Sequence, residues 1–306
     1  MPAWDHGHEI GGLKGCGCRG ARLGTFWGSE ASAHYPPNLE LEPTHTKINL
    51  FIDIQKETAS GDVTHKVVAR RAGVRTIELD AVAMLDVAVS DPEAHEVSWT
   101  YDGTKISVTW KRPFAAGEER SIQVKYRVEH PASGLFFMKP SPECPNKATY
   151  AATDHETELA RYWLPCIDLP NVRTSLEFHL RAAETHTILA NGKLIGENKH
   201  GDGTKTAEWR LEQRCPSYLV CFAIGDFTRF DDGVEAGIPL AYFAAKEFTP
   251  DDLKRTFGKT GKMLRWMTKK LDHPFPFPKY FQFALRSEEH TSELQSHSFI
   301  SYAVFC

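Results

Sequence analysis

The sequence lacks the features of a membrane protein, a nucleic-acid-binding protein or a secreted protein. No apolar run approaches the roughly 20 residues that a membrane-spanning helix needs. No basic run is interleaved with aromatic residues, and the formal net charge is −4, so no nucleic-acid partner is expected. The N-terminus has neither the basic start nor the apolar centre of a secretory signal. We therefore expect a cytoplasmic protein with no membrane partner.

A disulfide framework is also missing. The seven cysteines are irregularly spaced, and a chain of 306 residues can form a sizeable core without disulfides. His6, His8, Cys16 and Cys18 are zinc-type ligands, but the sequence around them is glycine-rich and has no periodicity. This composition favours a flexible tail over a metal site, and we expect the tail to cover residues 1–36.

Alternation of apolar and polar residues is the main structural signal that is present. Residues 48–54 alternate as a half-buried strand does, and similar short runs follow to about residue 230. Residues 97–101 and 106–110 flank Asp102-Gly103, which predicts a hairpin with a type I′ turn. The pattern predicts a mainly β fold, an antiparallel sandwich or saddle of sheets.

A helix signal follows this β-rich region. Thr249 suits the N-cap, Pro250 suits the first helical position, and two aspartates favour the positive helix end. One helix is predicted, ending before the proline-rich residues 273–278, with its apolar stripe packed on its own domain. The stripe consists of Leu253, Phe257, Met263, Leu264, Met267 and Leu271.

The stretch from residue 152 to residue 174 fits no simple periodicity. It begins with the carboxylates Asp154, Glu156 and Glu158, and its two prolines prevent a continuous helix. A long irregular segment of this kind is where a scaffold presents a functional loop. An ordinary polar loop entering a strand is the simpler interpretation, and these residues alone leave both open.

The C-terminal residues 286–306 resemble no protein element. They are similar to the in-frame translation of a sequencing-library adapter, with one constant block at residues 286–296 and a second at residues 300–306. We expect this tail to be an artefact and exclude it from fold and function. Codons that do not spell the adapter would contradict this expectation.

Several motifs follow one another in a fixed order between about residues 38 and 285. They are Leu41-Glu-Pro-Thr-His45, Ala160-Arg161-Tyr-Trp-Leu-Pro165, Leu189-Ala-Asn191-Gly192, Pro216-Ser-Tyr-Leu-Val220 and His273-Pro-Phe-Pro-Phe-Pro-Lys-Tyr280. In this order they resemble the zinc aminopeptidases of the aminopeptidase-N and leukotriene-hydrolase family. The resemblance implies a saddle-like β domain over residues 37–230. It also implies the incomplete start of a thermolysin-like α/β catalytic domain over residues 231–285.

The resemblance implies an activity and a site. The family removes N-terminal residues from peptides, so zinc is expected in the full-length protein and peptides with a free N-terminus are the expected partners. Glu156 stands where the family binds the substrate's α-amino group, and Asp154 stands where it usually has glutamine. These two are the candidate substrate-binding residues, since a carboxylate beside an ammonium forms a charge-assisted hydrogen bond. Arg161 and Asp168 are expected to be structural, and Cys166 a buried thiol.

The motifs that carry the family's chemistry are absent. The family has Gly-Ala-Met-Glu-Asn and then His-Glu-x-x-His, whose histidines bind zinc while the glutamate acts as general base. Neither motif occurs in this sequence. We therefore expect a fragment with no catalytic residue, no metal ligand, no bound zinc and no peptidase activity of its own.

Two alternatives come from other functional classes. A non-catalytic interaction protein built on the same β domain would show a degraded zinc motif in its downstream sequence. An unrelated carbohydrate-binding sandwich would present Trp99 and Trp110 on one open face, although core packing explains these side chains more simply.

Overall fold

The computed structural model describes residues 39–142, 145–286 and 299–305. The tail predicted for residues 1–36 lies outside this described part. The described residues are mainly β, as predicted, and belong to a compact unit that begins at Leu39. Their strands form four sheets of seven, four, four and three strands.

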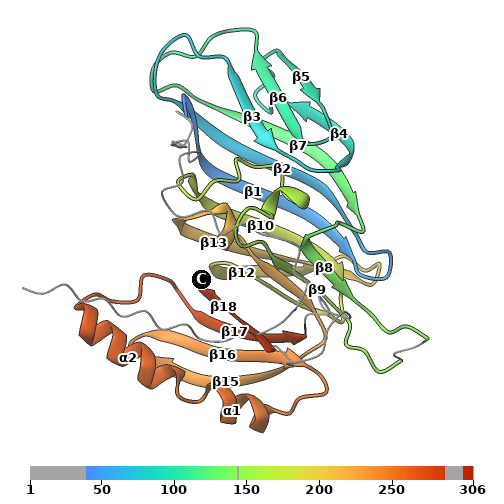
Figure 1. The fold of residues 1–306 in the computed structure, drawn as a ribbon, viewed down its shortest axis with the longest axis vertical. Coiled ribbons are helices and arrows are strands. Elements are labelled where there is room, and N and C mark those ends of the chain that lie inside the picture. The colour runs from blue at the N-terminus through green and yellow to red at the C-terminus, as the bar shows by residue number, and fades with distance from the viewer. Residues whose placement is uncertain (1–38, 143–144, 287–298, 306) are drawn as a thin grey trace, which may run out of the picture. The chain divides into compact units, whose positions relative to one another are not determined.

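The seven-stranded sheet contains the longest strands (Figure 1). Its order is β12 (Lys193–Lys199), β13 (Thr204–Pro216), β10 (Arg173–Ala183), β1 (Leu41–Asp53), β2 (Thr58–Ala69), β7 (Glu119–Glu129) and β4 (Leu85–Ser90). Neighbouring strands are antiparallel except β1 and β10, which are parallel and place Ile48 opposite Phe178. Both side chains are fully buried. The first strand therefore has a core partner that lies more than a hundred residues later in the sequence.

The three-stranded sheet confirms the predicted hairpin. Its order is β3 (Thr76–Asp80), β6 (Lys105–Trp110) and β5 (Val97–Tyr101). Val97 lies opposite Trp110, as the alternation predicted. Trp110 is fully buried and its Nε1 donates to Asp91 at 2.8 Å, whereas Trp99 is 38% exposed. The two tryptophans do not share an open face, which contradicts the carbohydrate-binding alternative.

The turn of this hairpin differs from the predicted type. A type I′ turn needs positive φ at both central residues, but only Gly103 has one, at 92°. Asp102 instead uses its carboxylate as an acceptor for the backbone N–H groups of Thr104 and Lys105, each at 2.7 Å. An aspartate side chain that binds the backbone ahead of it makes the turn without a second positive φ.

The stretch predicted to be irregular, residues 152–174, begins and ends in strands, because residues 152–154 belong to β9 (Tyr150–Asp154) of a four-stranded sheet and residues 173–174 to β10. The order of this four-stranded sheet is β11 (Thr187–Ala190), β14 (Phe222–Gly225), β9 and β8 (Gly134–Met138). Two short 3₁₀ turns, η1 (Ala160–Tyr162) and η2 (Ser217–Leu219), lie in the connections that follow β9 and β13. Most residues of β9, β11 and β14 are buried, so this sheet is covered on both faces.

The last sheet is the one against which the two helices pack. Its order is β15 (Phe227–Glu235), β16 (Ile238–Ala245), β17 (Tyr280–Arg286) and β18 (Phe299–Phe305). The helices α1 (Pro250–Phe257) and α2 (Thr260–Leu271) pack beside β15 and β16 (Figure 1). Thr249 caps α1 as predicted, because its side chain accepts from the Asp252 N–H while the Asp252 carboxylate accepts from the Thr249 N–H.

The single predicted helix is two helices, and the prediction for its apolar stripe is wrong in part. Leu253, Phe257 and Leu264 are buried, as expected. Met263, Met267 and Leu271 are 60%, 46% and 64% exposed. The physical reason is the position of α2 beside β15, an edge strand, so that only its first turns are covered.

The adapter-like tail is described only in part. The backbone of β18 pairs antiparallel with β17, with Phe299 opposite Arg286 and Phe305 opposite Tyr280. Residues 287–298 and 306 lie outside the described residues. This pairing does not test the origin of the segment, so its adapter origin stays a prediction.

Candidate substrate-recognition site

The candidate residues Asp154 and Glu156 lie at the end of β9, on either side of a buried histidine. Asp154 is half-buried, His155 is 2% exposed and Glu156 is exposed. Both carboxylates are more exposed than His155 between them, so they lie toward solvent while the histidine lies in the core. Among the described residues, the Glu156 carboxylate makes no hydrogen bond or ion pair. It is therefore available to a cation from outside the chain.

His155 anchors this loop to the core. Its Nδ1 lies 3.1 Å from the carbonyl oxygen of Tyr218, so Nδ1 carries the proton and donates it. Its ring stacks at a tilt on Trp163, with centroids 5.9 Å apart. Burial lowers the pKa of His155 to about 4, so the imidazole is neutral at pH 7.

Gly134 lets the loop pack closely on β8. Its φ is +77°, and a Cβ at this position would lie 2.1 Å from the Leu159 carbonyl oxygen and 3.3 Å from the Trp163 ring. Only glycine permits this approach. Trp163 is fully buried and its ring meets that of Phe222 edge-on, with centroids 5.2 Å apart. Because Phe222 lies on β14, the loop also packs against that strand.

Arg161 and Asp168 form the ionic frame of the loop, in agreement with their expected structural role. The Arg161 backbone N–H and Nε each donate to Asp168 Oδ2 at 3.2 Å. Ser217 Oγ donates to the other oxygen, Oδ1, at 2.6 Å. Asp168 is fully buried, while Arg161 also pairs with Glu158 at 2.9 Å. The charge of Glu158 is therefore already matched, unlike that of Glu156.

Cys166 is a buried free thiol, as expected. It is 6% exposed, and its backbone exchanges hydrogen bonds with Asp80 on β3. Burial raises the pKa of the Cys166 thiol well above its ordinary value. The thiol is therefore protonated and inert rather than nucleophilic.

His65 on β2 is a second buried histidine that supports the same loop. Its Nε2 donates to the Pro165 carbonyl oxygen at 2.7 Å, and its Nδ1 lies 3.0 Å from Thr46 Oγ1. Burial lowers the pKa of His65 to about 4. Neither histidine could be recognised as a support from the sequence, because each is buried by partners far away along the chain.

The buried histidines predict a loss of stability in mild acid. Since the folded pKa of His155 is about 4 and the ordinary value is 6.5, the unfolded chain takes up the proton first as the pH falls. This stability is fully present above about pH 6.5 and is lost as the pH falls toward 4, by about 2 kcal/mol between pH 7 and pH 5 for each histidine. Urea unfolding of the wild-type chain and of H155F at both pH values measures it.

H155F keeps an aromatic ring beside Trp163 but cannot titrate, so its loss between pH 7 and pH 5 should be smaller by about 2 kcal/mol. H200Q, at an exposed histidine, is the matched control and should keep the wild-type difference. An identical pH difference in H155F and the wild type would contradict the assignment.

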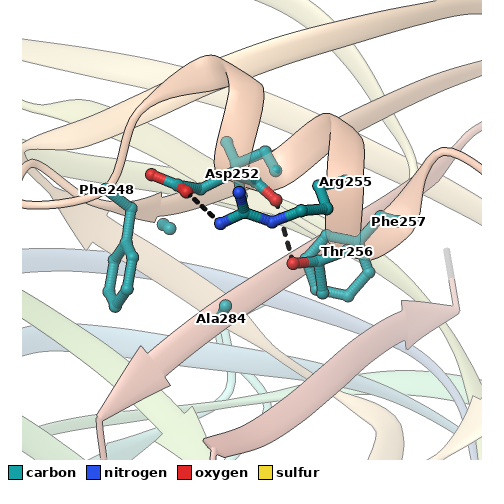
Figure 2. Close-up of a pocket in the computed structure, with 8 residues that line it drawn as sticks. Phe248, Asp252, Arg255, Thr256, Phe257 and Ala284 are labelled. Atoms are coloured by element: carbon teal, nitrogen blue, oxygen red, sulfur yellow. Dashed lines mark hydrogen bonds and ion pairs between the residues drawn. The ribbon is translucent and has the colours of Figure 1, made fainter.

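A separate cavity of about 340 Å³ lies between α1 and the last sheet (Figure 2). Ala244 and Ala284 lie opposite each other on β16 and β17, and their small side chains leave the space open. Phe248 and Phe257 line it, and an ion pair between Asp252 and Arg255 lies at its edge. Neither Asp154 nor Glu156 lines this cavity, so it is distinct from the candidate site.

The described residues do not fit a catalytic zinc site. One group of potential ligands, Asp91, Glu93 and His95, has its ligand atoms within 4.8 Å of one another. Asp91 already accepts from Trp110 Nε1 at 2.8 Å and from the Glu93 N–H at 2.8 Å, so its oxygens serve the loop itself. With no His-Glu-x-x-His in the sequence, no step of zinc chemistry is assigned to this chain.

The family model described as the peptidase M1 N-terminal domain matches residues 42–219, more than half of the chain. The chain therefore belongs to the peptidase M1 family through this domain. The match runs from β1 to η2 and includes Asp154 and Glu156. It confirms the resemblance that the ordered motifs indicated.

Curated relatives carry aminopeptidase names. The chain is 21% identical over 248 residues to the puromycin-sensitive aminopeptidase of Caenorhabditis elegans, covering 78% of this chain and 26% of the relative. It is 26% identical to leucine aminopeptidase 2 of Candida glabrata, covering 60% and 28%. It is 24% identical to human aminopeptidase B, covering 57% and 29%. The chain thus spans only between a quarter and a third of these relatives.

A solved structure shares the fold. It is a two-domain M1 zinc metallopeptidase, an E323A mutant bound to L-arginine, with a TM-score of 0.63 and 20% sequence identity. The similarity covers 80% of this chain and 56% of the other. Among the residues that the structure describes, no helix is both long and apolar enough to cross a membrane.

Proposed function

We propose that this chain is the substrate-recognising N-terminal part of a zinc-dependent aminopeptidase that removes N-terminal residues from peptides. The observation that carries the proposal is Glu156, an exposed carboxylate without a described partner on a loop fixed by buried contacts. A fixed carboxylate of this kind suits the α-ammonium of a peptide, because the charge-assisted hydrogen bond needs no rearrangement of the loop.

Asp154 suggests the substrate class. Asp154 is the last residue of β9 and Glu156 follows in the turn after it, so two carboxylates lie within one short segment. With Glu156 on the α-ammonium, the negative charge of Asp154 favours a cationic first residue more than a neutral glutamine would. The L-arginine bound to the related metallopeptidase is in keeping with this preference.

The zinc and the general base belong, in this proposal, to polypeptide that follows the region resembling the family. The curated relatives are three to four times longer than the part that this chain matches. We propose that the printed chain is inactive by itself and acts in the cytoplasm as part of the complete enzyme. The buried thiol of Cys166 is compatible with such a reducing compartment.

The complete enzyme tests this function with arylamides of arginine, lysine and leucine, each with a free or an acetylated amine. Only the free-amine substrates should be cleaved, and arginine and lysine should be preferred over leucine. D154N should lower the preference for arginine over leucine about tenfold, because the negative charge beside the bound amine is lost. Cleavage of acetylated substrates would contradict amine recognition, and an unchanged preference in D154N would contradict the role of Asp154.

A further inference from the structure

Lys279 is a buried cation that lies outside the candidate site. It stands just before β17 and is 4% exposed. Its Nζ donates to the carbonyl oxygens of Ala190 at 2.7 Å and Gly192 at 2.5 Å. It also lies 4.6 Å from the ring centroid of Trp209 and 5.2 Å from that of Phe281. Burying a lysine is costly, so these contacts indicate a specific task.

The turn that Lys279 binds has little freedom to move. Gly192 has a φ of +86°, and a Cβ there would lie 2.0 Å from the Arg210 carbonyl oxygen. The fully buried Asn191 donates to the Leu219 carbonyl at 3.0 Å, and its own oxygen accepts from the Cys221 N–H at 2.5 Å. Lys279 therefore binds a rigid reference point of the β domain.

This reference point shares a sheet with the amine-recognition loop, the segment Asp154–Glu158. Ala190 at the end of β11 lies opposite Phe222 on β14. Phe222 in turn donates its N–H to Thr153 Oγ1 at 3.1 Å, and Thr153 directly precedes Asp154 on β9. One row of contacts thus runs from Lys279 through β11 and β14 to the residue that begins the loop.

Lys279 directly precedes β17, which packs against the same core. Phe283 on β17 belongs to the same core cluster as the strands of the β domain. Gln213 Nε2 donates to the Pro276 carbonyl at 2.8 Å, a second tie between β13 and the segment before β17. The small space of about 10 Å³ between Ala190, Phe222 and Lys279 shows that this junction is closely packed.

We propose that Lys279 is a positioning residue that couples β17 to the amine-recognition loop through β11 and β14. The loop's role in binding an amine rests on the proposed function, but the coupling itself does not. In a complete enzyme, the coupling sets where the polypeptide after β17 lies relative to Glu156. Lys279 binds backbone carbonyl oxygens, and these remain when a side chain of β11 is substituted.

Hydrogen–deuterium exchange on the 306-residue chain tests the coupling without substrate. In K279M, amides of Thr187–Ala190 and of residues 153–156 should exchange about tenfold faster or more, while those of β1 and β2 stay unchanged. K246M is the matched control, because Lys246 is an exposed lysine paired with Asp226 at 2.9 Å, and it should leave residues 153–156 unchanged.

Faster exchange confined to residues 187–192 and 273–286 would overturn the coupling and leave Lys279 as a local anchor. A uniform increase over all strands would overturn it as well. If K279M fails to fold, K279Q, which keeps a polar side chain but removes the charge, is judged by the same outcomes. Since no substrate is present, failure here leaves the amine role of Glu156 intact, and that role is tested by its own substitution.

Discussion

E156A is expected to lower kcat/KM of the proposed complete enzyme for free-amine substrates by about 10- to 100-fold, mainly through KM. The reason is the loss of one charge-assisted hydrogen bond to the α-ammonium, which contributes about 1.5–3 kcal/mol. Folding should be unaffected, because the Glu156 side chain is exposed and makes no described contact. Steady-state kinetics with an arginine arylamide, together with a thermal melt, measure both parts.

E158A is the matched control for this prediction. Glu158 is also an exposed carboxylate on the loop, but it pairs with Arg161 at 2.9 Å. E158A should therefore change kcat/KM by less than about threefold. Equal losses in E156A and E158A would mean that the loop acts through its overall charge, and unchanged kinetics in E156A would remove the proposed role of Glu156.

D168A destabilises the chain by about 3–5 kcal/mol, because it removes the buried acceptor of several donors, each worth about 1–3 kcal/mol, among them the Arg161 backbone N–H and Nε. It also removes the acceptor of Ser217 Oγ at 2.6 Å. Urea unfolding at pH 7 measures the free energy of unfolding. D168N keeps the shape of the side chain and should lose less than D168A.

D202A is the control for a generic loss of negative charge. Asp202 forms an exposed ion pair with Arg181 and accepts from the Thr204 N–H at 3.0 Å, and such exposed contacts together contribute about 1–2 kcal/mol. If D168A costs no more than D202A, the ionic frame of Arg161 and Asp168 does not hold the loop. In that case the rigidity argued for Glu156 would also lose its main support.

Local patterns allowed the β-rich fold and parts of its pairing to be predicted. The alternation of residues 97–101 and 106–110 is a local signal, and the register of β5 and β6 follows from it. The parallel pairing of β1 with β10 was not predictable in this way, because it depends on which buried faces meet after a long excursion of the chain. The same holds for the covered extent of α2, since the width of the sheet beneath it is not a property of its own sequence.

The candidate site was predictable only in its exposed residues. Asp154 and Glu156 were identified from the family resemblance, whose family assignment the domain match confirms. Their binding roles stay predictions. His155 and Lys279 were missed as supports, because their importance comes from Tyr218, Ala190 and Gly192, which lie far away along the chain.

The most direct test of the account is an assay of the purified 306-residue chain with an arginine arylamide and added zinc. In the proposed function this chain recognises an N-terminus, but the His-Glu-x-x-His motif with its general base is absent from its sequence, so we expect no hydrolysis above the buffer control. Hydrolysis that a chelator abolishes and zinc restores would contradict it, because the chemistry would then reside in the printed chain.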